Sequence, residues 1–501
     1  MSVRTLVGLL ALLCAPCCAL RAATPPEPAL AIVVQDSVPL RATPRDSGRT
    51  HALLWQGETL EVRGERLDYL QVWDYRRERG GYVRASQVRR LALTPEEAPE
   101  LLALVRFLRS APGAEALGIG LAAAYIRAAP AAAFHGGDGV QALDALGDFA
   151  ERLAQRASSG AAQGKAAQAA LSAHLDVAVR YGVAFRTQEK DGRVRICYDG
   201  DAFRRVLAMD ASPQQLARAA LALTRPDCGG DELRPRERRL ADEWKAGVLE
   251  RVETAALPGY LRNRVHMRRA AVWASLAYQR ARGESRPGEA AAEAAQRAIA
   301  ALAAVSKGEL TDADAAAFSR AAMRVNASRW AATPDAGHVN PARPHVITAA
   351  GEPGETCILL VDAKRDASRP LARRCTYGLV WTGSATLNRE GNALALAVQS
   401  AEAWRELWLF RKAGGEWTVR VLPPAPMAPG VGYAEFAGWV PGGTQLLVAR
   451  EAAGEGKPLR NFELLRLDTL APVRQTGDPA MLAAFQRWQD PAWKRETLSL
   501  R

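Results

Sequence analysis

The hydrophobic pattern changes twice along the chain, and these changes limit what it can fold into. From Ala31 to about residue 93, apolar and polar residues alternate in short runs interrupted by glycine and proline, as in "HALLWQGETLEVRGE". Such alternation is typical of half-buried β-strands. From Thr94 the apolar residues recur at helical spacing, and after residue 345 the alternation returns. The pattern predicts a multidomain chain with a small all-β module, an all-α middle and an all-β C-terminal domain.

The predicted domain boundaries follow these changes. A chain of 501 residues is too long for one hydrophobic core, and about three domains is the expected number. The segments are a signal peptide at 1–22, a linker at 23–30, the all-β module at 31–93, the helical domain at 94–332, a linker at 333–345 and the β-rich domain at 346–501.

The first residues have the features of an export signal. Arg4 precedes an apolar run that ends at Leu13, and small residues follow, with cleavage expected after Ala19 or Ala22. The run is too short to span a bilayer as a stable helix, and no later segment is apolar enough to do so. Cysteines in the leader leave lipidation as an alternative, although the residues that precede them match a lipidation site poorly. We therefore expect a periplasmic or secreted protein of a Gram-negative bacterium.

Four cysteines remain once the leader is removed, and they form two close pairs. Cys197 and Cys228 belong to the helical domain, whereas Cys357 and Cys375 belong to the β-rich domain. This grouping is typical of structural disulfides in an oxidising compartment, each worth roughly 3 kcal/mol. Four separate buried thiols are the alternative. A zinc site is not indicated, because no CxxC motif or nearby histidine pair accompanies the cysteines.

The formal net charge of +12 comes largely from arginine. Abundant arginine and alanine together are typical of GC-rich genomes, so a bias of composition explains the charge. Attraction to an anionic surface polymer, such as lipopolysaccharide phosphates or a wall polymer, is the functional alternative. Nucleic acid is not an expected partner of an exported protein.

The all-β module resembles a bacterial SH3-type (SH3b) domain. "VPLRATP" at 38–44 matches the opening strand and loop of that family, and "LLWQGETLEVRGE" matches its central strand. Residues 69–72 match the aromatic-led third strand, and "RGGYVRASQV" at 79–88 matches the closing run. The resemblance implies a small SH3-like β-barrel that attaches to peptidoglycan or to a wall-associated protein. Tyr69 and Tyr82 stand where tryptophan is common in the family.

Aromatic residues of this module are the candidate ligand contacts. Tyr69, Trp73, Tyr75 and Tyr82 alternate across the strands, so a small barrel cannot bury all of them. Those on the surface would stack on sugar rings or grip a peptide, and Arg41 beside them would pair with a carboxylate. The alternative is an ordinary barrel core with a domain contact.

Helix-start signals organise the middle of the chain. "TPEE" at Thr94, "SPQQ" at Ser212 and "TDAD" at Thr311 predict capped helices. A hairpin centred on Asp191 and Gly192 interrupts the helices. The segment 260–282 has an arginine-rich face, which we interpret as the solvated side of a core helix. After the first helix, the others are expected at 115–129, 140–157, 161–181, 213–224, 235–256, 259–282, 288–305 and 312–331.

The C-terminal domain contains a weak internal repeat. "NREGNALALAV" followed by "ELWLFR" is repeated as "VPGGTQLLVAR" followed by "ELLRLD", and a third fragment, "FQRWQDPAWKRETLSLR", ends the sequence. These units resemble blades of WD40-like propellers. A closed propeller needs about four or more blades, so we expect either a partial propeller or stacked sheets.

No catalytic motif stands out. None of the six histidines lies in HExxH or in paired spacing, and His135 in "FHGGDG" is interpreted as part of a connecting loop. Nucleophile elbows and nucleotide-binding glycine loops are also missing from the sequence. We therefore assign no catalytic residue, metal or cofactor and expect a non-enzymatic binding or scaffolding protein of the cell wall. The alternative is a wall or polysaccharide hydrolase whose site is assembled from scattered carboxylates.

Overall fold

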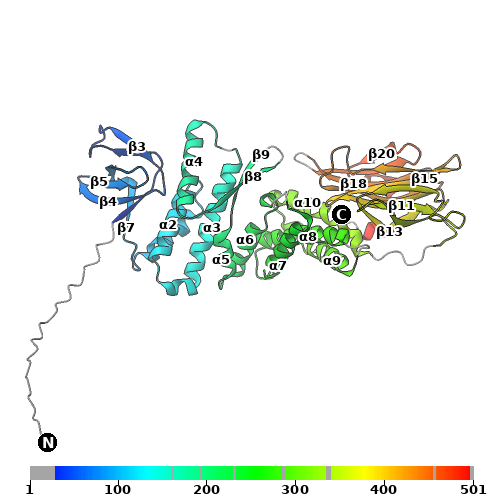
Figure 1. The fold of residues 1–501 in the computed structure, drawn as a ribbon, viewed down its shortest axis with the longest axis horizontal. Coiled ribbons are helices and arrows are strands. Elements are labelled where there is room, and N and C mark those ends of the chain that lie inside the picture. Colours follow the sequence, from blue (N-terminus) through cyan, green and yellow to red (C-terminus); the bar gives the residue numbers. More distant parts are fainter. Residues whose placement is uncertain are drawn as a thin grey trace, which may run out of the picture.

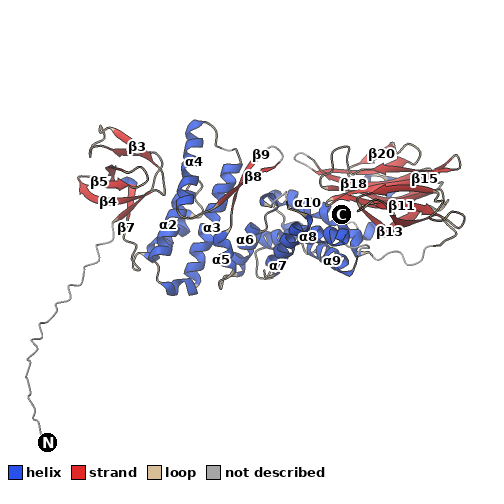
Figure 2. Cartoon of the chain, viewed as in Figure 1, coloured by secondary structure: helices blue, strands red, loops and turns tan. Residues whose placement is uncertain are grey.

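A computed structural model describes residues 29–160, 162–190, 193–229, 233–283, 288–333, 340–454 and 458–496. Its three parts follow one another along the longest axis in chain order (Figure 1). Strands form the two ends and helices form the middle, apart from one hairpin (Figure 2). The division into a small sheet, a helical middle and a multi-stranded C-terminal domain is confirmed. The predicted signal peptide lies outside the described residues.

The N-terminal part is one seven-stranded sheet in the order β3-β2-β6-β5-β4-β1-β7. Its strands are β1 (Leu30–Val33), β2 (Val38–Arg41), β3 (Thr50–Leu54), β4 (Thr59–Arg66), β5 (Tyr69–Asp74), β6 (Arg79–Arg84) and β7 (Val88–Leu91). Every strand contributes an apolar side chain to one core, so the sheet is curled around that core. Among the described strands, β3 and β7 remain unpaired edges, and the closed barrel that we expected is not formed.

The helical part contains ten α-helices and one hairpin within the described residues. The helices are α1 (Ala98–Leu108), α2 (Glu115–Ala128), α3 (Gly137–Ser158), α4 (Lys165–Arg180), α5 (Asp201–Leu207), α6 (Pro213–Leu223), α7 (Pro235–Glu250), α8 (Gly259–Gly283), α9 (Glu289–Ala303) and α10 (Asp312–Ser328). The hairpin consists of β8 (Phe185–Lys190) and β9 (Arg193–Tyr198), and its predicted turn lies outside the described residues. The helix α5 was not predicted, because seven residues are too few to show a helical period.

Two of the three predicted helix starts are confirmed. Ser212 and Gln215 form a reciprocal capping box at α6, and the side chain of Thr311 accepts the backbone N–H of Asp314 at α10. The prediction at Thr94 is wrong, since α1 begins four residues later. Glu97 does reach back, but its carboxylate accepts the backbone N–H groups of residues 92 and 93 (both 2.8 Å) and stabilises the turn before the helix.

The arginines of α8 do not form a free cationic face. Arg264 pairs with Asp314 (2.8 Å), and Arg282 donates to the carbonyl oxygen of Tyr377 (2.8 Å). Arg268 is half-buried and donates to carbonyl oxygens at the end of α6, and loss of hydration there lowers its pKa to about 10. The interpretation of this segment as a structural core helix is confirmed. None of the helices in the described ranges is both long and apolar enough to cross a membrane.

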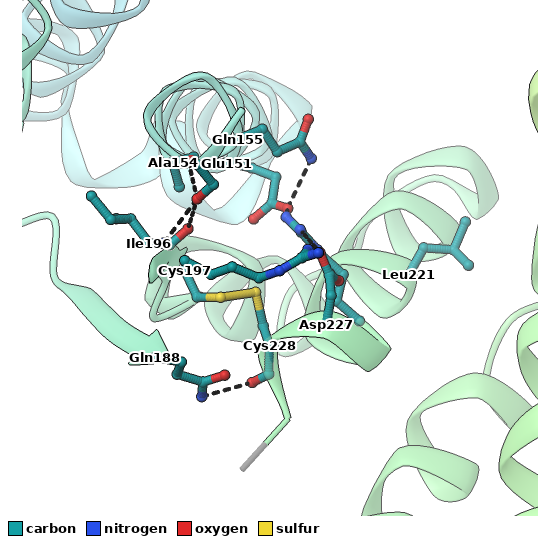
Figure 3. Close-up of polar contacts among 12 residues, drawn as sticks. Glu151, Ala154, Gln155, Gln188, Ile196, Cys197, Leu221, Asp227 and Cys228 are labelled. Atoms are coloured by element: carbon teal, nitrogen blue, oxygen red, sulfur yellow. Dashed lines mark hydrogen bonds and ion pairs between the residues drawn. A yellow bond between two sulfur atoms is a disulfide. The ribbon is translucent and has the colours of Figure 1, made fainter. Parts of the chain in front are cut away.

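The first disulfide fastens the hairpin to the helices (Figure 3). Cys197 in β9 is bonded to Cys228 in the short 3₁₀ helix η3 (Pro226–Cys228), with 5.8 Å between their Cα atoms. Gln188 donates to the carbonyl oxygen of Cys228 (3.4 Å), and Ser158 of α3 bonds the backbone of Ile196 (2.8 Å). The predicted pairing is confirmed. The disulfide joins the hairpin to the segment after it, and the hydrogen bond of Ser158 joins it to the helix before it.

The C-terminal part consists of a three-stranded and an eight-stranded sheet. Its strands are β10 (His345–Ala350), β11 (Thr356–Val361), β12 (Ala372–Thr376), β13 (Leu379–Leu387), β14 (Ala393–Ala401), β15 (Trp404–Ala413), β16 (Glu416–Leu422), β17 (Gly432–Val440), β18 (Gln445–Ala453), β19 (Pro458–Arg466) and β20 (Pro472–Thr476). The larger sheet comprises two antiparallel meanders, β13–β16 and β17–β20. Only a short parallel contact, in which Arg405 lies opposite Tyr433, joins them.

The meander β13–β16 is buried on both faces. Leu396 and Phe410 pack against the three-stranded sheet, whereas Ala395 and Leu409 pack against Val448 in the second meander. The larger sheet therefore folds back on itself at the contact between β15 and β17, and the C-terminal part is a stack of three layers. The two sequence repeats occupy equivalent hairpins, β14–β15 and β18–β19.

Up to residue 496, where the described residues end, the third repeat fragment does not form a strand. Residues from this fragment form two short helices, α11 (Ala483–Trp488) and α12 (Pro491–Glu496). Phe485 and Trp493 pack edge-on against Phe462 of β19 and cover the outer face of the second meander. At the opposite side of the stack, Cys357 and Cys375 lie directly across from each other in β11 and β12 and are disulfide-bonded, as predicted.

Candidate functional site

The N-terminal sheet has a core face and an outer face, and most predicted ligand contacts lie on the outer one. Leu70 and Val72 of β5 point into the curled core, so the alternate residues Tyr69 and Trp73 point outward. In β6, Val83 belongs to the core, and its neighbour Tyr82 therefore lies on the outer face.

Tyr82 and Arg41 are neighbours on this face. They lie directly opposite each other in β6 and β2, and Gln71 lies opposite Tyr82 on its other side. The guanidinium of Arg41 donates to the carbonyl oxygens of Asp46 (2.5 Å) and Gly48 (3.2 Å). Arg41 thus fastens the loop between β2 and β3, while the half-buried ring of Tyr82 remains partly accessible.

Trp73 is the centre of a second group, which we call the Trp73 cluster: Glu61, Arg63, Trp73 and Tyr75. The guanidinium of Arg63 lies 4.5 Å from the centroid of the Trp73 ring and donates two hydrogen bonds to Glu61 (3.1 and 3.2 Å). Tyr75 is 65% exposed and donates its hydroxyl proton to Glu61 (2.5 Å). These bonds from Arg63 and Tyr75 lower the pKa of Glu61 and keep it ionised.

Gly80 makes room for the Trp73 ring. It lies opposite Trp73 in β6, and a Cβ atom at this position would approach the indole Cε3 to 3.2 Å. The first glycine of "RGGYVRASQV" therefore gives the indole an open place on the outer face. The second glycine, Gly81, allows close packing in the core instead, because a Cβ atom at this position would lie 2.7 Å from Leu40.

Tyr69 is closed off from the surface. Its side chain points outward from β5, yet the residue is only 2% exposed. The hydroxyl donates to Asp46 (2.7 Å), and the guanidinium of Arg84 lies 5.3 Å from the ring centroid and is paired with the same carboxylate (3.0 Å). The accessible aromatic set of the outer face is therefore Trp73, Tyr75 and Tyr82.

A buried polar network holds the sheet on the helices. His174 of α4 is 3% exposed, and its Nε2 lies 2.8 Å from Asp36, in the loop after β1. Arg156 of α3 donates to Nδ1 of the same ring (2.8 Å). Because a guanidinium only donates, Nδ1 accepts and the Nε2 proton is directed to Asp36. Gln56 completes the network by donating to Asp36 (3.2 Å) and to the carbonyl oxygen of Gly113 (2.8 Å).

The network also sets the ionisation of Asp36. Burial by itself raises the pKa of this carboxyl, but the hydrogen bonds from His174 and Gln56 outweigh burial and hold the pKa below its ordinary value. Around it, Tyr181 donates to the carbonyl oxygen of Gly57 (2.8 Å), and Ile32 of β1 packs on the helical core. The sheet is thus held on a fixed base, and Ile32 contacts the helices from the face opposite the sheet's own core.

A second buried network joins the helices to the C-terminal sheets. Glu435 of β17 accepts from Arg329, in the 3₁₀ helix η5 (Arg329–Ala332), at 3.0 Å and also from Arg405 of β15. Arg405 is fully buried, and its guanidinium donates to the carbonyl oxygen of Asn326 in α10 (2.6 Å). Burial lowers the pKa of Arg405 to about 10, which leaves it charged at neutral pH.

Neither network was foreseen from the sequence. His174 and Asp36 are 138 residues apart, and Arg329 and Glu435 are 106 residues apart. None of these residues belongs to a sequence motif that would indicate its partner. The available signal was a histidine at a position where the helical period predicts burial, since a buried polar group needs a partner.

One group of potential metal ligands occurs in the described part of the chain. The ligand atoms of Glu355, Cys357 and Cys375 lie within 4.8 Å of one another. The two sulfur atoms are bonded to each other, so neither is available as the thiolate that a metal ion requires. This group is therefore part of the disulfide and not a metal centre.

Comparison with protein-family models, curated proteins and solved structures found no match for this chain.

Proposed function

We propose that this protein is a non-catalytic binding protein of the cell envelope, which attaches to peptidoglycan or to a wall-associated partner through the outer face of its N-terminal sheet. The observation that carries the proposal is the Trp73 cluster beside Tyr82. Accessible aromatic rings next to a fixed arginine and carboxylate can stack on the apolar faces of sugars and bond their polar groups. The likeness of this segment to SH3-type domains supports the same function.

Two features support a location outside the cytoplasm. The disulfides Cys197–Cys228 and Cys357–Cys375 fit an oxidising compartment, and the N-terminal residues resemble an export signal. Periplasm or secretion is the location that we propose, and the wall polymers would be within reach there.

We also propose that the C-terminal part is a partial propeller. Four-stranded antiparallel sheets that stack face to face are the arrangement of neighbouring propeller blades. The meanders β13–β16 and β17–β20 stack in this way, and the three-stranded sheet adds a shorter layer. Helices α11 and α12 cover the last layer, where a closed propeller would have its next blade.

Sedimentation with purified sacculi tests the binding function. The protein should co-sediment and stay bound at about 0.3 M salt, where screening has weakened attraction between exposed charges. Trp73→Ala and Tyr75→Ala should each reduce the bound fraction. Trp244→Ala is the matched control, because Trp244 is an exposed tryptophan of α7, far from the N-terminal sheet (Figure 1). Loss of all binding at that salt concentration, or equal binding by every variant, would contradict the proposal.

A further inference from the structure

A cavity of about 460 Å³ lies where the helical part meets the C-terminal sheets. Its walls come from the first half of α9, from η5 and from the start of β13. Pockets that hold small organic ligands have volumes of roughly 300–1,000 Å³ and often lie between domains. The size and the position of this cavity therefore suit a bound small molecule.

Two tryptophans form rigid parts of the cavity wall. Trp381 of β13 is buried, and its indole N–H donates to Gln399 (3.2 Å). Trp330 of η5 has the guanidinium of Arg329 at 4.3 Å from its ring centroid, and Arg329 is itself held by Glu435. Since both rings are held by neighbours, the apolar wall is formed before any ligand arrives.

The indole nitrogen of Trp330 is a buried donor without a hydrogen-bond partner among the described residues. An unsatisfied buried donor costs about 1–3 kcal/mol, so such groups in native proteins usually have a partner in a water or a ligand. Trp330 lines the large cavity and also a smaller one of about 60 Å³. The nitrogen itself is shielded from the cavity surface, so an oxygen atom of a bound molecule would satisfy the donor once the lining shifts slightly on binding.

The polar lining indicates which ligand chemistry fits. Gln296 and Glu289 of α9 face the cavity together with Thr333 and Thr382. Glu289 is the one charged residue among the lining residues that the structure describes, and no lysine or arginine accompanies it. A phosphate or carboxylate ligand would therefore find no cation among the described lining residues. Amide, hydroxyl and carboxylate groups suit a ligand rich in hydroxyl groups, and indole rings suit the apolar faces of sugar rings.

We propose that this cavity between α9, η5 and β13 binds a neutral oligosaccharide, with Trp330 and Trp381 as its wall and Gln296 as a polar contact. The site is distinct from the outer face of the N-terminal sheet, and its existence does not depend on the proposed attachment to the wall.

Titration calorimetry of the purified protein with the N-acetylglucosamine tetramer tests the proposal. Binding is expected, and the tetramer of galacturonate, which has the same number of rings but carries four carboxylates, should bind at least about 10-fold more weakly because the described lining residues include no cation. Absence of binding of the neutral tetramer, or equal binding of the two tetramers, would overturn the proposal.

Variants locate the binding. Trp330→Phe keeps an aromatic ring but removes the N–H, and Gln296→Ala removes an exposed amide whose loss does not disturb the core. Each should weaken binding about 3- to 10-fold, the effect of one neutral hydrogen bond. Glu293→Ala, on the same helix but outside the cavity lining, is the control and should bind normally. Normal binding by both Trp330→Phe and Gln296→Ala, or loss of binding in Trp73→Ala, would place the ligand elsewhere and refute the proposal.

Discussion

The imidazole of His174 directs its Nε2 proton to the carboxylate of Asp36 at 2.8 Å, across the junction between the helices and the N-terminal sheet. Arg156, Gln56 and Glu115 extend this contact into a network, in which Arg156 pairs with Glu115 at 2.7 Å. The network lies at the base of the sheet and determines how firmly the sheet is held.

His174→Ala should destabilise the protein by about 1–3 kcal/mol, because it removes the buried ring that Arg156 and Asp36 share as a partner. Denaturant unfolding measures the loss. The control is Asp176→Ala, which breaks the exposed pair of Asp176 with Arg76 at the same junction and should cost less than about 1 kcal/mol. Equal losses of unfolding free energy for the two substitutions would show that the network around His174 stabilises the protein no more than an exposed ion pair does.

The stability of the protein should fall in acid, partly through Asp36. Its pKa is lower in the folded state than in the unfolded state, so its stabilising contribution is complete above the ordinary value. The contribution is lost as the pH falls below about 4 and passes through the folded value. Melting temperatures at pH 7, 5 and 3 should therefore show a smaller acid-induced drop for Asp36→Asn than for the unchanged protein. An identical drop would contradict this role.

Glu435→Gln should be among the most destabilising single substitutions. It would leave the buried guanidinium groups of Arg329 and Arg405 without their carboxylate, and loss of one partner of a buried ion pair costs about 3–5 kcal/mol. Asp468→Asn is the control, since it breaks an exposed pair with Arg466 and should cost less than about 1 kcal/mol. Thermal unfolding of the two variants gives the comparison.

Reduction of the disulfides should lower stability through the unfolded chain. Cys197 and Cys228 are 31 residues apart, and the chain-entropy model assigns such a crosslink about 3–4 kcal/mol. The double variant Cys197→Ser with Cys228→Ser should unfold at correspondingly lower denaturant concentration. A reducing agent should then destabilise this variant less than the unchanged protein, because only the second disulfide remains to be broken.

Gly81→Ala should destabilise the N-terminal sheet by about 1–3 kcal/mol, because the new methyl group would lie 2.8 Å from the backbone oxygen of Arg41 and overpack the core. Gly247→Ala in α7 should instead stabilise the protein. No atom lies within 4 Å of a Cβ at that position, and alanine favours a helix over glycine by about 1 kcal/mol. Denaturant unfolding of both variants measures this difference.

Local patterns predicted those features that depend on residues close in sequence. The caps at Ser212 and Thr311 involve partners three residues away, and both formed as predicted. The start at Thr94 failed because Glu97 bonds the backbone before the turn instead of the cap. Alternation showed that the aromatic residues of the first sheet cannot all be buried in its core. It did not show which of them would be covered, because a loop residue, Asp46, helps to close Tyr69 off.

The order of parts and the cysteine pairs were determined by the sequence itself, because hydrophobic periodicity and clustered cysteines reflect burial and crosslinks within short stretches of chain. The tertiary structure alone decided that the first sheet stays open, that the C-terminal meanders stack, and that His174 meets Asp36 and Glu435 meets Arg405. Those contacts join polar residues that are far apart in the sequence, and a polar residue carries no sign of its partner until folding brings the two together.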